Sequence, residues 1–174
     1  MEDRAFDNEI MELLSRGHEG AYWDYKSDYP DYPEDKLKDI ICMANNLENR
    51  DAYLIYGANN DGSICGIENT SVSRISSAGL TEFLRTKPVA GGYYPQTDVK
   101  TINAGEHQLD EVIIYNSRHT PYYLQEKYGK GHDVKKHLTP GTIYTRIYDT
   151  NTPTNGTASI EQTEYLWRKR FGYD

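Results

Sequence analysis

The segment AYLIYGANNDGSICGI, residues 52–67, constrains the fold of this chain more than any other. Its first part, AYLIYGA, is a short run of apolar and aromatic residues, which is typical of a buried β-strand. The dipeptide Asp61-Gly62 follows, and it favours the tight turn of a β-hairpin. The sequence therefore predicts a buried strand over residues 52–58 and a hairpin that returns through a second short strand.

Helices and further strands are predicted on both sides of this hairpin. Apolar residues at helical spacing predict helices over residues 5–16 and 34–46, and segments 71–87 and 160–171 also have helical character. Strands are expected over residues 20–29, 99–102, 111–115 and 141–148. This mixed order predicts an α+β fold, with a mixed β-sheet and flanking helices. Because neither a repeat nor a linker interrupts it, residues 1–174 are expected to form a single domain.

The composition indicates a folded, acidic protein. Aromatic residues make up 12% of the chain, including 16 tyrosines, whereas disordered chains lack aromatics. The formal net charge of −8 argues against a non-specific nucleic-acid binder with a basic face, although a local basic patch could still bind. We expect a cytoplasmic location, because the N-terminus is not a signal peptide, no apolar run spans a membrane, and Cys42 and Cys65 form no CxxC pair.

The stretch EGAYWDYK, residues 19–26, combines two carboxylates with a lysine. Since side chains alternate along a strand, Asp24 and Lys26 share one face, and Trp23 and Tyr25 share the other. Carboxylates such as Glu19 and Asp24 could hold a divalent cation, and a lysine could neutralise charge on a phosphate. The alternative is a surface salt bridge between Asp24 and Lys26, which would contribute about 0–1 kcal/mol.

Over most of its length the chain resembles the Schlafen AlbA-type domain family. The family opens with a Glu and an aliphatic-Glu-Phe-Lys unit, which match Glu19 and Trp23-Asp24-Tyr25-Lys26. Later family motifs match, in order, Cys42-Met43-Ala44-Asn45-Asn46, the strand and turn over residues 54–67, Pro121-Tyr122-Tyr123, Tyr144-Thr145-Arg146, and Asn151-Thr152-Pro153 with Ala158. The resemblance implies an α+β Schlafen AlbA-type core.

Some members of this family are metal-dependent endoribonucleases that cut structured RNA such as transfer RNA. The resemblance implies a catalytic centre of Glu19, Asp24, Lys26 and Asp61. In it, Glu19, Asp24 and Asp61 would bind Mg²⁺ or Mn²⁺, and Lys26 would contact the scissile phosphate. Two positions depart from the family pattern. Asp24 replaces the usual Glu, and counting forward through the turn puts Asn60, rather than Asp61, at the third acidic position.

Residues 118–146 are locally basic, and Tyr122, Tyr123 and Tyr128 interleave with the basic side chains. Lysines and arginines that contact phosphates, beside aromatic residues that stack on bases, are typical of RNA binding. An ordinary solvated loop could have the same composition. We predict nucleic-acid contacts from Arg118, Lys127, Lys130, Lys135, Lys136 and Arg146.

Three functions remain open from the sequence. The first is a small endoribonuclease acting as a defence or toxin effector, which could form a homodimer or respond to a regulatory protein partner. The second is a non-catalytic module that binds nucleic acid or docks a protein. The third is nucleotide or small-ligand binding, for which the chain carries no P-loop motif.

Overall fold

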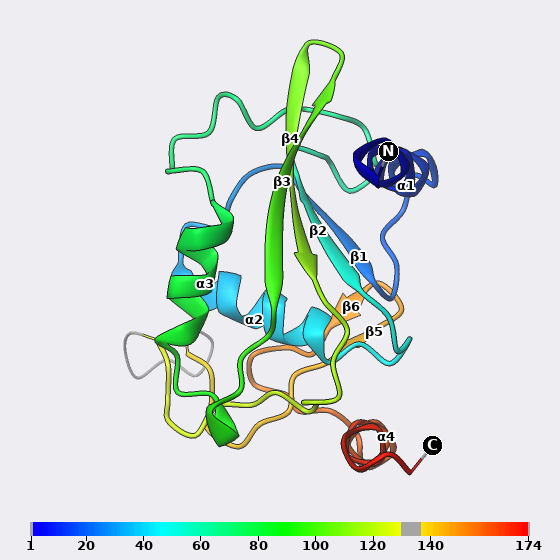
Figure 1. Ribbon diagram of the computed structural model, residues 1–174. Helices are drawn as coiled ribbons and strands as arrows, with labels where there is room; N and C mark the ends of the chain where they lie inside the picture. Colours follow the sequence, from blue (N-terminus) through cyan, green and yellow to red (C-terminus); the bar gives the residue numbers. More distant parts are fainter. Residues whose placement is uncertain (1, 130–136, 174) are drawn as a thin grey trace.

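The computed structural model describes residues 2–129 and 137–173, with side chains from residue 7 onwards. Its main sheet comprises β1 (Trp23–Lys26), β2 (Ala52–Tyr56), β3 (Thr97–Ala104) and β4 (His107–Ile114), in the spatial order β1-β2-β4-β3 (Figure 1). Strands β1 and β2 run parallel, while β2–β4 and β3–β4 are antiparallel pairs. The structure thus confirms the predicted α+β fold with a mixed sheet.

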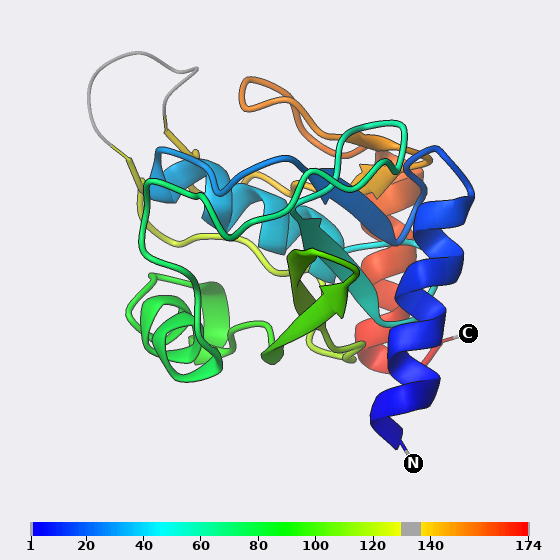
Figure 2. The same cartoon turned by 90° about the horizontal axis from the view of Figure 1, so that it is seen from above.

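Helices cover both faces of this sheet (Figure 2). On one face lie α2 (Pro33–Ala44), which connects β1 to the parallel β2, and α3 (Ser77–Arg85). On the other face lies α1 (Glu2–Ser15). The remaining elements are a short 3₁₀ helix, η1 (Ala90–Gly92), the two-residue strands β5 (Arg146–Ile147) and β6 (Thr150–Asn151), and the C-terminal helix α4 (Ile160–Phe171).

The alternation of side chains along the strands divides the core between these two faces. On β2, Leu54 and Tyr56 join the apolar cluster beneath α2 and α3, whereas Ile55 joins the cluster beneath α1. Asp24 and Lys26 lie in parallel register with Leu54 and Tyr56. Their side chains therefore point to the α2 face, at the edge of the sheet.

The predicted hairpin over residues 52–67 forms only its turn. Ala58 and Ile64 make a single antiparallel bridge, and the Gly57 carbonyl accepts hydrogen bonds from the Cys65 and Gly66 N–H groups at 2.8 and 2.9 Å. The expectation of a second strand was wrong because β1 and β4 already occupy both edges of β2.

The late strand predicted over residues 141–148 is also shorter than expected, since only Arg146 and Ile147 pair with a neighbouring strand. The residues before β5 bond instead to side chains. The Asn45 side chain donates to the Tyr144 carbonyl at 2.8 Å, and the Thr145 N–H donates to Thr152 Oγ1 at 3.0 Å. These bonds anchor the segment to the end of α2 and fix the position of Arg146.

The other predicted elements are present with altered ends. The paired strands expected at 99–102 and 111–115 are longer, as β3 and β4. The helix expected over 71–87 begins only at Ser77, because the Ser76 side chain caps it by accepting from the Gly79 N–H. Within the described residues, no helix is both long and apolar enough to cross a membrane.

Candidate active site

Asp24 and Lys26 lie side by side on the edge strand β1, as their spacing predicted. Lys26 Nζ is 2.9 Å from Asp24 Oδ2. Asp24 is only 3% exposed, and a carboxylate that has lost its water needs charged or hydrogen-bonding partners. The pair is therefore part of a buried network, and the alternative of a simple surface salt bridge does not describe it.

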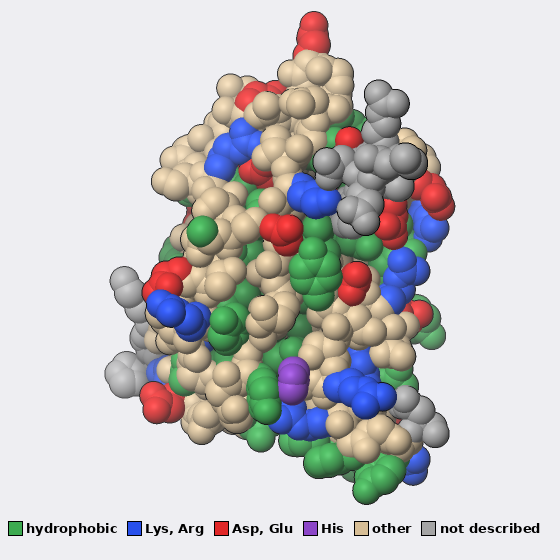
Figure 3. All heavy atoms as spheres, viewed as in Figure 1, with side chains coloured by type: hydrophobic (Ala, Val, Ile, Leu, Met, Phe, Trp, Pro, Cys, Tyr) green, Lys and Arg blue, Asp and Glu red, His purple; other side chains and the backbone are tan. Residues whose placement is uncertain are grey.

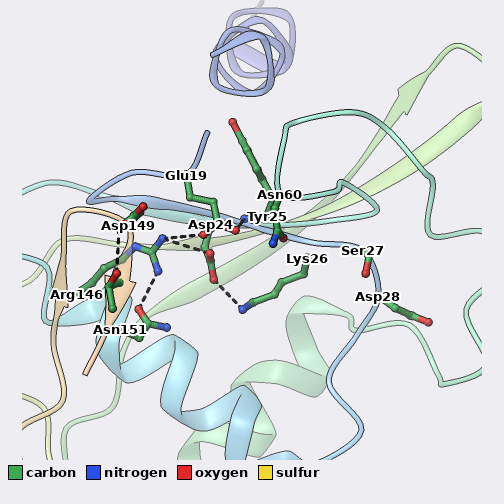
Figure 4. Close-up of a pocket in the computed structure, with 11 residues that line it drawn as sticks. Glu19, Asp24, Tyr25, Lys26, Ser27, Asp28, Asn60, Arg146, Asp149 and Asn151 are labelled. Atoms are coloured by element: carbon green, nitrogen blue, oxygen red, sulfur yellow. Dashed lines mark hydrogen bonds and ion pairs between the residues drawn. The ribbon is translucent and has the colours of Figure 1, made fainter. Parts of the chain in front are cut away.

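Arg146 reaches the same carboxylate from β5 (Figure 4). Its guanidinium lies 3.3 Å from Asp24 Oδ1 and donates to the Gly20 and Trp23 carbonyls at 2.7 and 3.2 Å. The residue is 2% exposed. The sequence predicted Arg146 as a nucleic-acid contact on a basic surface. The structure places it instead in the wall of the site, where it orients Asp24 and fixes the start of β1.

Glu19 precedes β1 and completes the acidic part of the site. Its carboxylate accepts a hydrogen bond from the Tyr25 N–H at 3.4 Å and lies 3.7 Å from Arg146 Nη2. Burial, together with the neighbouring charge of Asp24, raises the pKa of Glu19 to about 7. Two carboxylates of like charge thus share the site, an arrangement common in functional sites.

Two residues that the sequence analysis did not assign to the site, Asp39 of α2 and Asn151 of β6, connect the cationic groups. Asn151 accepts from Arg146 Nη1 and donates to Asp39 Oδ1, both at 2.9 Å. Asp39 Oδ2 is 3.4 Å from Lys26 Nζ. These contacts close a ring formed, in order, by Arg146, Asn151, Asp39, Lys26 and Asp24. Asp39 and Asn151 are 112 residues apart, so no local pattern could have paired them.

Glu19 and four members of the ring, Asp24, Lys26, Arg146 and Asn151, border an open cavity of about 410 Å³ (Figure 4). The charged side chains in its lining are the carboxylates of Glu19, Asp24, Asp28 and Asp149 and the cations of Lys26 and Arg146. The rest of the lining consists of Tyr25, Ser27, Asn60, Thr150 and Asn151. Because carboxylates outnumber cations, the cavity favours the binding of an additional cation.

Glu19 and Asp24 are the residues best placed to hold Mg²⁺ or Mn²⁺. The part of the chain that the structure describes has no cluster of three or more His, Cys, Asp or Glu side chains arranged to hold a metal ion. Mg²⁺, however, commonly binds through one or two carboxylates and keeps several waters. Burial, and after it the charge of Asp24, raises the pKa of Glu19, and a divalent cation would relieve the repulsion between the two carboxylates. Two carboxylates therefore fit such an ion, and the Asn60 amide lines the same cavity.

Asp61, the predicted third carboxylate, does not line the cavity. It is exposed, and its carboxylate accepts a hydrogen bond from the Ser63 N–H at 2.9 Å and another from the Ser63 hydroxyl. Asn60 lines the cavity instead. The structure thus agrees with the residue count that puts Asn60 at the third acidic position of the family pattern. In this chain the side chain at that position is a neutral amide.

Apart from Arg146, the described cations of the predicted basic segment lie outside the cavity. Arg118 and Lys127 are exposed, and neither is a lining residue. Tyr122 belongs to the apolar core, while the Tyr128 ring lies 4.7 Å from Lys87 Nζ. The other predicted contacts in the segment lie outside the described residues: Lys130, Lys135 and Lys136.

One solved structure shares this fold at low sequence identity, and a second is similar over most of the chain with a lower TM-score. The DIP2311 protein from Corynebacterium diphtheriae is 16% identical, with a TM-score of 0.51 over 88% of this chain. That match covers 27% of DIP2311, so the present chain spans about a quarter of its length. The N-terminal domain of a RecG-related protein from Nitrosomonas europaea is also 16% identical, with a TM-score of 0.44 over 88% of this chain and 95% of that domain.

No curated protein matches the chain. A family model does: the model described as Schlafen, AlbA_2 matches residues 19–155. The match begins at Glu19 and extends past Asn151, so it includes every residue of the ring and most of the chain. This protein is therefore a member of the Schlafen AlbA_2 family.

Proposed function

We propose that this protein is a metal-dependent endoribonuclease that cleaves structured RNA, with transfer RNA as the first substrate to test. The observation that carries the proposal is the convergence of Glu19, Asp24, Lys26 and Arg146 on one open cavity. Cleavage of a phosphodiester requires an activated nucleophile and stabilisation of the negative charge that develops on the phosphate. The cavity offers residues for both requirements.

Each side chain has a distinct role in this proposal. Glu19 and Asp24 hold Mg²⁺ or Mn²⁺, which when bound supplies an activated water and charge stabilisation. Lys26, held between Asp24 and Asp39, donates to a non-bridging phosphate oxygen as negative charge develops there. Arg146 is mostly enclosed, so it acts as a positioning residue that keeps Asp24 oriented.

Cleavage of total transfer RNA tests the proposal directly. The purified protein is incubated with transfer RNA, or with a short DNA duplex, in Mg²⁺, Mn²⁺ or EDTA. We expect RNA fragments only with metal, and their loss in Glu19→Gln and Lys26→Gln. Glu12→Gln, an exposed acid on α1, is the matched control and should cleave like the parent. Intact RNA in every metal, with folded parent protein, would refute the nuclease.

A specific observation also favours a non-catalytic nucleic-acid-binding module. Asp24 already has ion pairs with both Lys26 and Arg146, and Asn60 occupies the position of the third carboxylate. A gel-shift assay separates the two functions, since RNA that is retained but never cut supports the module. If RNA is neither cut nor retained, a docking role toward a protein partner becomes the better proposal.

A further inference from the structure

Two lysines outside the cavity converge on a single aromatic ring. Lys36 belongs to α2, and Lys87 lies just after α3. The Nζ atom of each is 4.2 Å from the centroid of the Phe83 ring, so the two nitrogens can be no farther apart than twice that distance. Lys87 Nζ is also 4.7 Å from the centroid of the Tyr128 ring. The pair thus joins α2, the end of α3 and the segment that the sequence marked as basic.

Neither Lys36 nor Lys87 has an acidic partner among the described residues. Lys87 Nζ donates to the Thr86 hydroxyl at 3.2 Å, whereas Arg85 on the adjacent helix pairs with Glu82 at 2.6 Å. Burial and the charge of Lys87 lower the pKa of Lys36, and burial lowers the pKa of Lys87. Two ammonium groups held close together without a counter-ion repel each other. An anion that accepts hydrogen bonds from both would remove that repulsion.

Lys36 lies on the same helix as Asp39, a member of the ring. Lys36 precedes Asp39 by three residues on α2, which is about 4.5 Å along the helix axis. A second depression, of about 320 Å³, shares Lys26 and Asp28 with the cavity and extends to Asp35 and Lys38 on the same helix. Figure 3 shows Lys and Arg side chains reaching the surface on the side of the molecule that carries α3.

We propose that Lys36 and Lys87 form a phosphate-binding site that holds a phosphate group of an RNA strand while another part of that strand occupies the cavity. A phosphate has several oxygens and can accept hydrogen bonds from two ammonium groups at once. The acidic cavity cannot by itself attract a polyanion such as RNA. The Lys36–Lys87 pair supplies a contact with the RNA. The inference rests on the nucleic-acid role proposed above, but it does not require cleavage.

Binding of a fluorescein-labelled single-stranded RNA, measured by anisotropy in EDTA at several salt concentrations, tests the inference. For single strands each phosphate contact contributes a slope of about −0.7 to the plot of log affinity against log salt. We therefore expect the Lys36→Gln/Lys87→Gln protein, which loses one phosphate contact, to have a slope shallower by about 0.7, with affinity about tenfold weaker at 0.15 M salt. The matched control, Arg85→Gln/Arg168→Gln, removes two exposed cations that have acidic partners, and it should keep the parent slope.

RNAs with a 5′-hydroxyl or a 5′-phosphate distinguish backbone phosphates from a terminal phosphate. If the Lys36→Gln/Lys87→Gln protein binds both RNAs more weakly than the parent does, the site holds a backbone phosphate. If it binds only the 5′-phosphorylated RNA more weakly, the site holds the terminal phosphate. An unchanged slope in the double variant, or a parent protein that binds neither RNA, would overturn the inference. If RNA binding depends on the two lysines but no RNA is cleaved in the presence of metal, the phosphate-binding site is upheld and the nuclease is refuted. Failure of one proposal can therefore be told apart from failure of the other.

Discussion

At the scale of single residues, Asn60 and Asp61 decide how many carboxylates the cavity can offer to a metal. Asn60 lines the cavity, whereas the Asp61 carboxylate is outside it and bonded to Ser63. The affinity of an oxygen-ligand site for a hard cation depends on the number of charged ligands. The identity of position 60 should therefore control metal affinity, and that of position 61 should not.

We expect Asn60→Asp to bind Mn²⁺ roughly tenfold more tightly than the parent, because it adds a third carboxylate to the site. Asp61→Asn should bind Mn²⁺ like the parent, and it serves as the matched control at the neighbouring position. Titration calorimetry with Mn²⁺ measures both affinities. A loss of affinity in Asp61→Asn would show that the turn rearranges to bring Asp61 into the cavity, contrary to this structure.

At the scale of secondary-structure elements, β5 and β6 are too short to be stable as an isolated pair. Side chains hold them in place. Arg146 connects β5 to Gly20 and Trp23 at the start of β1, and Asn151 connects β6 to Asp39 on α2. The geometry of the site therefore depends on these bonds more than on strand pairing.

Arg146→Met removes the cationic partner of Asp24 in β5 while keeping an unbranched side chain. Removing one member of a buried ion pair typically costs about 3–5 kcal/mol, because the other charge remains buried. We expect the free energy of unfolding, measured by urea denaturation, to fall by about that amount. Arg168→Met, at an exposed position on α4, should change it by less than about 0.5 kcal/mol. Equal losses in the two variants would contradict the anchoring role of Arg146.

Some features of these elements could be predicted from the sequence, and others could not. The alternation in EGAYWDYK correctly placed Asp24 and Lys26 on one face, because a period of two follows directly from strand geometry. The return strand after Gly62 was predicted wrongly, because strand pairing depends on which neighbours already occupy β2. The link between Asp39 and Asn151 could not be predicted, since it exists only where α2 and β6 meet in space.

At the scale of the whole molecule, one buried acid lies between the sheet and α1. Glu111 is at the centre of β4 and is 0% exposed. Neither of its carboxylate oxygens has a hydrogen-bond partner among the described residues. Burial raises the pKa of Glu111 to about 8, with Glu9 and Asp7 of α1 adding to the shift and Lys100 opposing it. The folded protein therefore holds this group protonated at pH values where the unfolded chain ionises it.

This difference links stability to pH with a defined sign. Between the unfolded pKa of about 4.5 and the folded pKa of about 8, the native state binds one proton more than the unfolded chain, so stability falls as pH rises. Above about pH 8 both states are ionised and this contribution becomes constant. The total loss is on the order of 5 kcal/mol, because each unit of the shift from 4.5 to about 8 corresponds to about 1.4 kcal/mol.

Glu111→Gln isolates this contribution, because the amide is a neutral group of nearly the same shape. We expect Glu111→Gln to match the parent in urea denaturation near pH 4.5 and to be more stable by about 4–5 kcal/mol near pH 8. Glu106→Gln, in the exposed turn between β3 and β4, is the matched control and should follow the parent at both pH values. If the difference between Glu111→Gln and the parent does not change with pH, Glu111 is ionised in the native state, and α1 must then lie farther from the sheet than it does here.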